Sequence, residues 1–262
     1  MNNLKGKVAI VTGSSRGVGA STAVKLAETG CNVVINYTTS ETEAKKTMAA
    51  CEAAGAETLL CRADVSKDED CRRMVAEAMG KWNRIDALVN NAGTTKFCDH
   101  NDLDGLEKED FLHIYAVNVI GPYQMIRAAV PHMKKSGRGS VVNVASIAAI
   151  TGIGSSIAYA ASKGALVTMT LSLARVLGPE IRVNAVCPGF IQGRWLKEGL
   201  GDEFYEAIKT HLEGSAPLGV TATAETVADA ILYFLWGAEI ITGETLILDG
   251  GNHLSQTPLM RR

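Results

Sequence analysis

The chain has 262 residues, of which 47% are hydrophobic and 21% are charged, a balance that excludes wholesale disorder. This length allows one large domain or two small ones, at the usual ~100–200 residues per domain. The formal net charge is −2 and the sequence contains no basic block. These two features exclude an electrostatic binding surface for nucleic acid or an anionic membrane.

Cysteines and histidines indicate the compartment and the absence of a metal site. The six cysteines contain no C-x-x-C pair, so we expect free thiols in a reducing compartment. The five histidines show no metal-ligand spacing, and we expect no bound metal. The N-terminus leads directly into the strand-like residues 8–11, and the longest apolar run, 164–177, is shorter than a membrane span of ~18 residues. We therefore expect a cytoplasmic protein with no membrane partner and no nucleic-acid partner.

Short β-branched runs alternate with longer amphipathic segments along most of the chain. The runs predict strands at 8–12, 32–36, 57–62, 87–90, 140–145, 182–186 and 245–248. The segments between them predict helices near 17–29, 41–54, 67–80, 107–134, 156–178 and 224–236. Several strands are apolar on both faces, as in a parallel sheet covered by helices on both sides. The alternation predicts an α/β fold, a doubly wound parallel sheet of about seven strands, in a single domain over residues 1–262.

The irregular stretch 187–223 interrupts this alternation. It places Trp195, Phe204 and Tyr205 among charged residues and glycines. Ligands of open α/β sheets bind beyond the carboxyl ends of the strands, so an excursion over about 190–215 could be a substrate lid. The alternative is a surface helix pair that packs its aromatic side chains into the core.

A glycine-rich turn joins the first strand to the first helix. Its sequence, Thr12-Gly-Ser-Ser-Arg-Gly-Val-Gly19, has the spacing G-x3-G-x-G. Glycines let the backbone turn sharply and approach a pyrophosphate, which the helix N-terminus stabilises. The turn therefore predicts a dinucleotide site.

The end of the second strand bears on the choice of cofactor. NAD sites usually carry a carboxylate there, about 20 residues beyond the glycines, which binds the ribose 2′-hydroxyl. Here the strand ends Asn36-Tyr37-Thr38, and the first acidic residue is Glu41 in the next helix. Since Arg16 in the glycine turn can pair with a 2′-phosphate, we expect NADP(H) in preference to NAD.

Tyr159 and Lys163 stand at positions i and i+4 of a predicted helix, on one face. An unperturbed tyrosine has a pKa near 10, and a nearby cation favours the phenolate and lowers that pKa toward neutrality. Ser146 ends the fifth strand, where its hydroxyl could donate to a substrate carbonyl while Tyr159 delivers a proton. Asn118 adds a polar group to an otherwise apolar helix face. We therefore take Asn118, Ser146, Tyr159 and Lys163 as the candidate catalytic residues.

Taken together and in order, these motifs resemble those of the short-chain dehydrogenase/reductase family from about residue 6 to 252. The resemblance rests on Thr12-Gly13-x3-Gly17-x-Gly19, Asp64-Val65, Asn90-Asn91-Ala92-Gly93, Asn118, Ser146, Tyr159-x3-Lys163, Pro188-Gly189, Ile241-Thr242-Gly243 and Asp249-Gly250-Gly251. It implies a Rossmann-type NAD(P)-binding domain and an oxidoreductase that acts on a carbonyl or a secondary alcohol.

The resemblance also implies roles for single residues. Gly13, Arg16, Gly17 and Gly19 would hold the cofactor phosphates, Asp64 and Val65 would contact adenine, and Asn91 would lie beside the ribose. Lys163 would bind the nicotinamide ribose, Asn118 would anchor a proton-relay water, and the Ile191 backbone would meet the carboxamide. Further expected cofactor contacts are Ser15, Val18, Asn36, Tyr37, Thr38, Ala92, Gly93, Tyr159, Pro188 and Gly189.

Within the family, the chain is most similar to 3-oxoacyl-acyl-carrier-protein reductases. Two alternatives stay open, an NAD(P)-dependent sugar, polyol or other alcohol dehydrogenase and a non-catalytic cofactor-binding regulator. One departure from the family pattern is Gly193, where many members carry a threonine that binds the cofactor. The long helices predicted at 107–134 and 156–178, together with the family likeness, lead us to expect a homotetramer.

Overall fold

The structure, a computed structural model, describes residues 4–255. Its centre is one parallel sheet of seven strands in the order β3-β2-β1-β4-β5-β6-β7. The strands are β1 (Val8–Val11), β2 (Asn32–Tyr37), β3 (Thr58–Arg62), β4 (Ala87–Asn90), β5 (Gly139–Val144), β6 (Ile181–Pro188) and β7 (Thr245–Leu248). The doubly wound α/β sheet expected from the alternation of strands and helices is confirmed. Residues 1–3 and 256–262 of the single domain expected over 1–262 lie outside the described residues.

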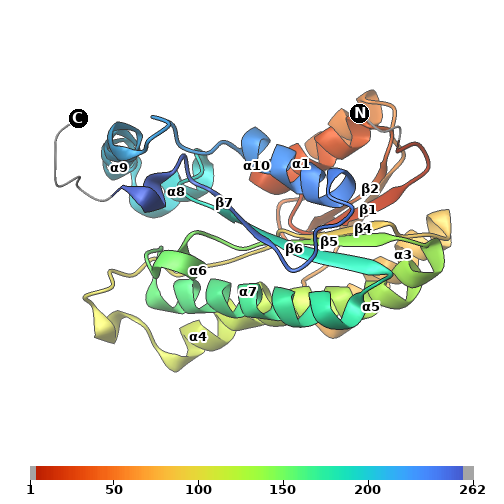
Figure 1. Cartoon of the computed structure of the whole chain (residues 1–262), viewed down its shortest axis with the longest axis horizontal. Coiled ribbons are helices and arrows are strands. Elements are labelled where there is room, and N and C mark those ends of the chain that lie inside the picture. The colour runs from red at the N-terminus through yellow and green to blue at the C-terminus, as the bar shows by residue number, and fades with distance from the viewer. Residues whose placement is uncertain (1–3, 256–262) are drawn as a thin grey trace.

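Helices cover both faces of the sheet (Figure 1). One layer contains α1 (Gly17–Glu28), α2 (Glu41–Ala53) and α10 (Ala224–Leu232), with α1 packed between the other two. The other layer contains α3 (Asp68–Trp82), α4 (Lys108–Tyr115), α5 (Gly121–Ser136) and α7 (Ile157–Leu177), and the short α6 (Ala148–Thr151) packs on α7. Two further helices, α8 (Arg194–Leu200) and α9 (Asp202–Ser215), lie between β6 and α10 in the sequence.

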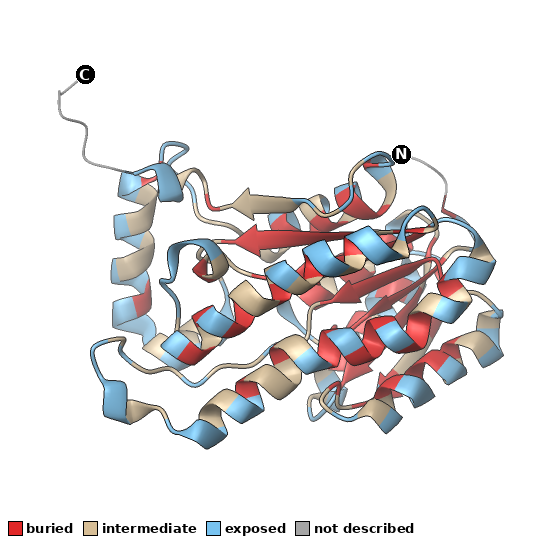
Figure 2. Ribbon diagram, turned by 60° about the horizontal axis from the view of Figure 1, so that its bottom comes forward, coloured by how far each residue is buried: buried red, intermediate tan, exposed pale blue. Residues whose placement is uncertain are grey.

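The central strands are buried on both faces, which explains why their sequences are apolar without alternation. Every residue of β1, β4 and β5 is buried, and Figure 2 shows these strands beneath half-exposed helices. One apolar cluster fills the space between the sheet and the α1, α2 and α10 layer, and a second lies under α3 and α5.

Two of the expected helices are interrupted by single π-helical turns. The helix expected at 107–134 consists of α4, a π turn at Ala116–Ile120 and α5, and the helix expected at 224–236 consists of α10 and a π turn at Tyr233–Gly237. Single π-helical turns inside α-helices are frequent at functional sites. The first turn carries the buried Asn118.

The helix α7 is longer than the apolar run 164–177, which we expected to be too short to span a membrane. Its 21 residues make it long and apolar enough to cross a membrane, by length and composition alone. That expectation about length is therefore corrected. In this structure α7 packs against β6, α4 and α6, so its apolar composition has an explanation within the fold.

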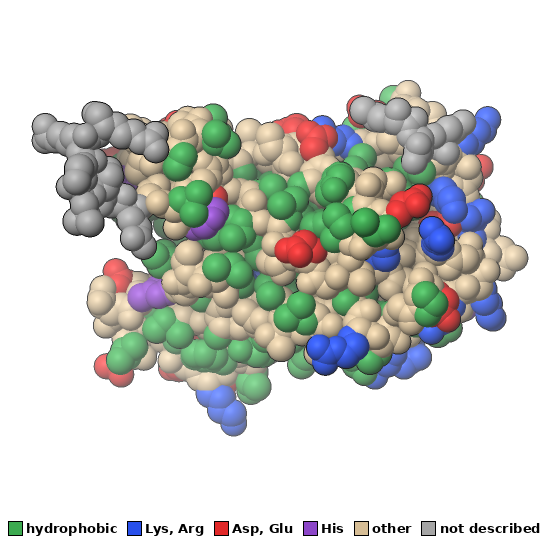
Figure 3. All heavy atoms as spheres, viewed as in Figure 1, with side chains coloured by type: hydrophobic (Ala, Val, Ile, Leu, Met, Phe, Trp, Pro, Cys, Tyr) green, Lys and Arg blue, Asp and Glu red, His purple; other side chains and the backbone are tan. Residues whose placement is uncertain are grey.

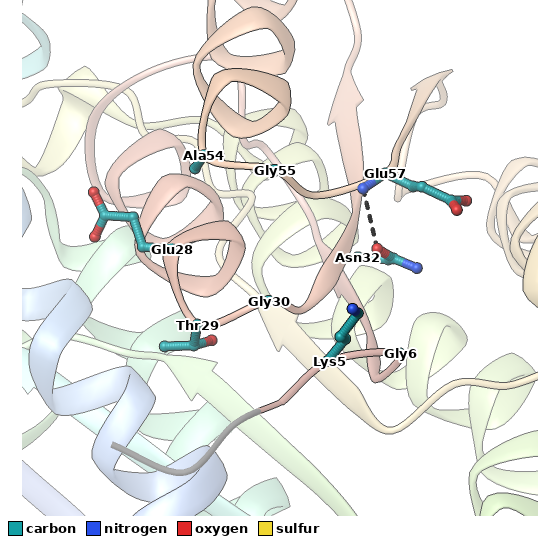
Figure 4. Close-up of a pocket in the computed structure, with 9 residues that line it drawn as sticks. All are labelled: Lys5, Gly6, Glu28, Thr29, Gly30, Asn32, Ala54, Gly55 and Glu57. Atoms are coloured by element: carbon teal, nitrogen blue, oxygen red, sulfur yellow. Dashed lines mark hydrogen bonds between the residues drawn. The ribbon is translucent and has the colours of Figure 1, made fainter.

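A cavity of about 470 Å³ lies at the amino ends of β2 and β3, between Lys5, Glu28, Asn32 and Glu57 (Figure 4). Asn32 Oδ1 accepts a hydrogen bond from the Glu57 backbone N–H at 3.0 Å across this region. The cavity lies at the sheet edge opposite the predicted motifs, which follow the carboxyl ends of the strands. The site predicted by those motifs therefore lies at the opposite edge of the sheet from this cavity.

Candidate active site

Four neighbouring strands end at the predicted motifs. The glycine turn follows β1, Asn91 follows β4, Ser146 lies just beyond β5, and Gly189 follows β6. The strands β1 and β4 are adjacent although β2 and β3 come between them in the sequence, so the strand order reverses at this point. Such a reversal at the carboxyl edge is where open α/β sheets bind ligands.

The glycine turn is shaped so that backbone, without side chains, faces the ligand region. Gly13 and Gly17 have φ angles of +62° and +57°, which other residues rarely adopt. A Cβ at Gly19 would lie 2.5 Å from both Asn91 Nδ2 and the Gly13 carbonyl oxygen, and one at Gly13 would lie 2.9 Å from the Ala92 Cα. This close packing requires glycine at both positions, and a glycine turn that opens a helix in this way is suited to bind the pyrophosphate of a dinucleotide.

Buried polar side chains hold the turn in place. Asn91 Nδ2 donates to the carbonyls of Thr12 and Gly13 at 2.9 and 3.1 Å, and Thr12 Oγ1 accepts from the backbone N–H of Asn91 and Ala92. Asn36 Oδ1 accepts from the Gly13 N–H at 2.9 Å, while its Nδ2 donates to the Ala63 carbonyl at 2.9 Å. Asn36 is 2% exposed. Its side chain therefore supports the glycine turn, which differs from the direct cofactor contact that we expected.

The helix α1 begins directly after this turn with its first N–H groups uncapped by a side chain. Its N-cap, Arg16, makes no capping hydrogen bond, and the first turn contains no acidic residue. The Ser15 carbonyl accepts from Thr47 Oγ1 of α2 at 3.3 Å, and the Val18 side chain packs against the core. The helix start is therefore anchored while its positive end stays available to an anion.

A guanidinium group from β3 lies beside the carboxyl end of β2, and the sequence did not indicate this. Arg62 Nε, from the end of β3, donates to the Thr38 carbonyl at 3.1 Å, so Arg62 lies across the residue that we expected at the ribose. Tyr37 is 9% exposed and forms a hydrogen bond with Glu41, which contributes, after the pairing with Lys45, to a lowered pKa of the Glu41 carboxyl.

Asp64 and Val65 have structural partners of their own. Asp64 Oδ1 accepts from both the N–H and the hydroxyl of Ser66, at 3.0 and 2.7 Å, which stabilises the turn before α3. Val65 is buried, its side chain packs on Gly121, and its carbonyl accepts from Gln124. An adenine contact by either residue stays a prediction.

Tyr159, Ser146 and Lys163 meet above the end of β5. Ser156 caps α7 by accepting from the Tyr159 N–H at 3.2 Å, which fixes the first turn that carries the tyrosine. The Tyr159 and Ser146 hydroxyls form a hydrogen bond. Lys163 is 4% exposed, and its Nζ donates to the Val144 carbonyl at 2.8 Å and lies 5.6 Å from the centroid of the Tyr159 ring.

Burial dominates the acidity of both groups. It raises the pKa of Tyr159 to about 12, although the hydrogen bond from Ser146 lowers it. It also lowers the pKa of Lys163 to about 8. The pKa of Tyr159 is therefore shifted upward in this structure, opposite to the direction that we expected from Lys163, because burial disfavours the phenolate. A tyrosine that stays protonated at neutral pH is suited to giving a proton to a developing alkoxide.

Asn118 fixes the loop after β4 to α7. Its Oδ1 accepts from the Thr94 N–H at 2.8 Å, and its Nδ2 donates to the Thr94 carbonyl and to Ser162 Oγ at 2.9 and 3.0 Å. The amide is fully buried and both of its ends are engaged. Asn118 therefore acts in this structure as a positioning residue, and its side-chain amide is already committed where we expected it to anchor a water. Gly93 lies beside it, and a Cβ at this position would be 3.4 Å from Asn118 Oδ1.

The loop after β6 is attached to its neighbours at several points. The Pro188 carbonyl accepts from the Ile147 N–H at 2.8 Å, and a Cβ at Gly189 would lie 2.7 Å from that of Asp249. Ile191 forms an isolated bridge with Ala222. The Gly193 N–H donates to the Tyr205 hydroxyl at 3.2 Å, so the position that departs from the family pattern joins α8 to α9.

The excursion shows features of both expected arrangements, the substrate lid and the helix pair with buried aromatic side chains. Tyr205 is 3% exposed and packs on Phe190 inside the excursion, whereas Phe204 is 58% exposed. Trp195 lies over the candidate site, with its ring centroid 6.2 Å from that of Tyr159. Phe97 also contacts Trp195, with the ring centroids 5.8 Å apart.

Several residues near the site were not predicted from the sequence. Thr12 was visible as part of a motif, but its two accepted hydrogen bonds were not. Phe97, Arg62 and Glu198 carry no motif, and only the folded chain brings them to the site. Among residues 4–255, no group of three or more His, Cys, Asp or Glu side chains is placed to hold a metal ion.

Comparisons with known proteins match nearly the whole chain. A family model described as enoyl-(acyl carrier protein) reductase matches residues 13–253. The chain is 44% identical over 247 residues to a protein of Streptomyces violaceoruber named as ketoacyl reductase 2 of the granaticin polyketide synthase, covering 94% of this chain and 96% of that relative. It is 32% identical over 250 residues to a 3-oxoacyl-[acyl-carrier-protein] reductase of Staphylococcus aureus, covering 95% of this chain and 98% of that relative.

Solved structures give the same result. A chain described as a short-chain dehydrogenase/reductase from Burkholderia xenovorans superposes with a TM-score of 0.88 at 42% identity, covering 95% of this chain and 98% of that one. The structure of an NAD+-bound xylitol dehydrogenase superposes with a TM-score of 0.87 at 26% identity, covering 95% of this chain and all of that one.

Proposed function

The chain belongs to the short-chain dehydrogenase/reductase family of oxidoreductases, and from that premise we propose that it is an NADP-dependent carbonyl reductase for 3-oxoacyl thioesters or similar ketones. One observation carries this proposal. Ser146, Tyr159 and Lys163 meet at the carboxyl edge of the sheet, at the same edge as the glycine turn. This arrangement places a hydrogen-bond donor, a protonated phenol and a cation around one position where a carbonyl oxygen can bind.

The proposed mechanism assigns one task to each side chain. A bound nicotinamide would supply hydride to the carbonyl carbon, so that negative charge would develop on the carbonyl oxygen. Ser146 donates a hydrogen bond to that oxygen, and Tyr159 transfers its hydroxyl proton to it. Lys163, held by the Val144 carbonyl, provides positive charge behind the tyrosine and binds ribose hydroxyls. Asn118 keeps the loop after β4 against α7 and so holds the site in shape.

The preference for NADP rests on the positive charge near the end of β2, where the ribose that carries the 2′-phosphate is expected to bind. Arg16 lies at the start of α1, and Arg62 lies across Thr38. Two guanidinium groups near a ribose that lacks a carboxylate partner at the strand end favour a 2′-phosphate. The cofactor contacts predicted at Asp64, Val65, Asn91, Pro188, Gly189 and Ile191 belong to this proposal.

The substrate class rests on the relatives. Two relatives that match over almost the whole chain are named as ketoacyl or 3-oxoacyl reductases. On the face shown in Figure 3, Lys and Arg side chains gather toward the end with α3, α5 and the N-terminus.

The proposal also includes the oligomeric state, the domain organisation and the cellular location of the protein. We retain one domain over residues 1–262, with the excursion at about 190–215 as a substrate lid. Exposed apolar side chains along the outer helices support a homotetramer: Leu112, Ile120, Tyr123, Leu171 and Val176. Six free cysteines, five of them buried, support a reducing and hence cytoplasmic location.

Steady-state kinetics with both cofactors test the proposal. The substrates are a 3-oxoacyl thioester, small ketones, secondary alcohols and polyols, each with NADPH or NADP+ and with NADH or NAD+. We expect the highest kcat/KM for a 3-oxo compound with NADPH. A preference for polyol oxidation with NAD+ would instead favour the alcohol dehydrogenase alternative, and the absence of any turnover would favour the non-catalytic one.

A further inference from the structure

Three aromatic rings from three separate segments pack together with tilted ring planes, and we refer to them as the aromatic stack. Trp195 of α8 contacts both Phe97, in the loop after β4, and Tyr159 of α7. The ring centroids are 5.8 and 6.2 Å apart, with interplanar angles of 52° and 46°. Trp195 is 40% exposed, so part of its ring faces open space although its neighbours are ordered around it.

The contact between Phe97 and α8 depends on a glycine. A Cβ at Gly199 would overlap the Phe97 ring, so any other residue there would displace either the helix or the ring. Gly199 lies one turn after Trp195 in α8. The Phe97 ring therefore packs against the helix backbone next to the tryptophan.

The Phe97 loop is itself fixed to the segment that begins α7. The Cys98 N–H donates to the Ser155 carbonyl at 2.9 Å, the hydroxyls of Thr95 and Ser155 are 2.7 Å apart, and His100 Nε2 lies 3.2 Å from the Gly154 carbonyl. These bonds connect the loop to residues just before Tyr159. The stack thus has two supports, α7 and the loop after β4, and one ring carried by the excursion.

We propose that Trp195 and Phe97 are the specificity-determining pair of the site and favour ketones that carry a planar apolar group, aromatic or conjugated, next to the carbonyl. This inference rests on the proposed function and deepens it. A substrate oxygen that receives the Tyr159 proton must lie against the tyrosine hydroxyl, and the adjoining substituent then meets the Trp195 face. Ring faces supply apolar contact and offset stacking, and they offer no strong acceptor for the hydroxyls of a polyol.

The test compares two β-keto esters that differ only in this substituent, ethyl benzoylacetate with a phenyl group and ethyl acetoacetate with a methyl group. The wild-type protein should prefer the phenyl compound. Trp195→Ala should lower kcat/KM for the phenyl compound by about tenfold and change that for the methyl compound by less than about twofold, within the range that one apolar contact provides. Trp195→Phe should retain most of the preference because it retains a ring.

Two glycine variants distinguish an effect of the aromatic stack from a general effect on the stability of the excursion. Gly199→Ala should reduce the phenyl preference by displacing Phe97 from α8. Gly214→Ala is its matched control in α9, because a Cβ there meets no atom within 4 Å. Phe204→Ala is the matched control for Trp195, since Phe204 is an exposed aromatic residue of the neighbouring helix. Both controls should leave the ratio of the two esters unchanged.

Equal losses for both esters in Trp195→Ala would overturn the inference, and so would a gain for the phenyl compound, which would make Trp195 a steric barrier. Calorimetric binding of the two esters to the NADP+-loaded protein gives a readout without turnover, because the oxidised cofactor has no hydride to transfer, and a Kd ratio that stays the same in Trp195→Ala would also overturn it. If the wild-type protein reduces neither ester nor any other ketone, the proposed function fails, while the binding ratio still decides the role of Trp195.

Discussion

Glu198 Oε2 of α8 lies 3.6 Å from Nη1 of Arg16 in the glycine turn. The other carboxylate oxygen, Oε1, lies 3.1 Å from Nε of Arg194. The carboxylate is thus shared by two guanidinium groups, and it connects the excursion to the start of α1. Arg16 and Glu198 are 44% and 54% exposed, so the pair is weak and screened by salt. A cofactor phosphate that pairs with Arg16 must compete with this carboxylate.

Removing the competing carboxylate should therefore strengthen NADPH binding. We expect Glu198→Gln to lower the Kd for NADPH by up to about fivefold, the range for an exposed ion pair, and to leave the Kd for NADH nearly unchanged. Fluorescence titration at low salt measures both. Glu206→Gln is the matched control, because Glu206 pairs with Lys197 of α8 at 3.2 Å without involving Arg16. An equal change for both cofactors would show that Glu198 acts on the excursion and not on Arg16.

Arg16 itself should set the choice of cofactor. A charge-assisted contact with the 2′-phosphate contributes on the order of 1.5–3 kcal/mol, which corresponds to about ten- to a hundredfold in affinity. We expect Arg16→Ala to weaken NADPH binding by that factor and to change NADH binding little. The ratio of kcat/KM for NADPH to that for NADH measures the effect. Comparable values of the two in the wild-type protein would contradict the NADP assignment, as would an unchanged ratio in the variant.

The pH dependence of cofactor binding should report Lys163. Burial lowers the pKa of this lysine to about 8, so its ammonium is charged below pH 8 and loses its proton as the pH rises through that value. If the charged form binds the ribose hydroxyls, affinity for NADPH is highest at neutral pH and falls by about tenfold by pH 9.5. Tyr159, with a pKa of about 12, does not titrate in this window.

Titrations of NADPH binding between pH 7 and 9.5 check this expectation. The window lies above the pKa of a phosphate monoester, which is about 6, so the 2′-phosphate stays ionised throughout. Lys163→Met should bind NADPH weakly at every pH, without the decline above pH 8. A decline of the same size in this variant would assign it to another group.

The sheet was predictable because its signals are local. The strands β4 and β7 begin and end where the sequence indicated. Every residue of β4 is buried, and a fully buried parallel strand is apolar on both faces. The glycine turn was also visible, because its φ angles restrict the residue type. The π turn at Ala116–Ile120 was not predicted, although the sequence did single out its residue Asn118.

The contacts that shape the site come from residues far apart in the sequence. Arg16 with Glu198, and Phe97 with Trp195, meet only after the excursion has folded over the sheet edge, so no spacing rule predicts either pair. The role of Asn36 was assigned to the ligand because the sequence shows its place at a strand end but not its burial. The acidity of Tyr159 also depends on burial, which the Tyr-x3-Lys motif does not describe.

The exchange of Tyr159 for phenylalanine tests the proposed chemistry most directly. Negative charge that develops on the substrate oxygen needs a proton, and Tyr159 carries the acidic hydroxyl that is hydrogen-bonded to Ser146. Ser146 can stabilise the oxygen but is too weak an acid to replace the tyrosine. Tyr159→Phe keeps the ring and its packing on Trp195, so folding and NADPH binding should survive.

Loss of a positioned general acid should lower kcat by roughly 10²–10⁴-fold. Single-turnover reduction of a 3-oxo compound by bound NADPH measures this step without product release. Ser146→Ala is the companion variant, because it removes the hydrogen bond to the oxygen and leaves the proton donor in place, so it should slow the reaction less than Tyr159→Phe does. If Tyr159→Phe kept more than about a tenth of the wild-type rate, another group would have to supply the proton, because the loss would fall short of what a general acid contributes.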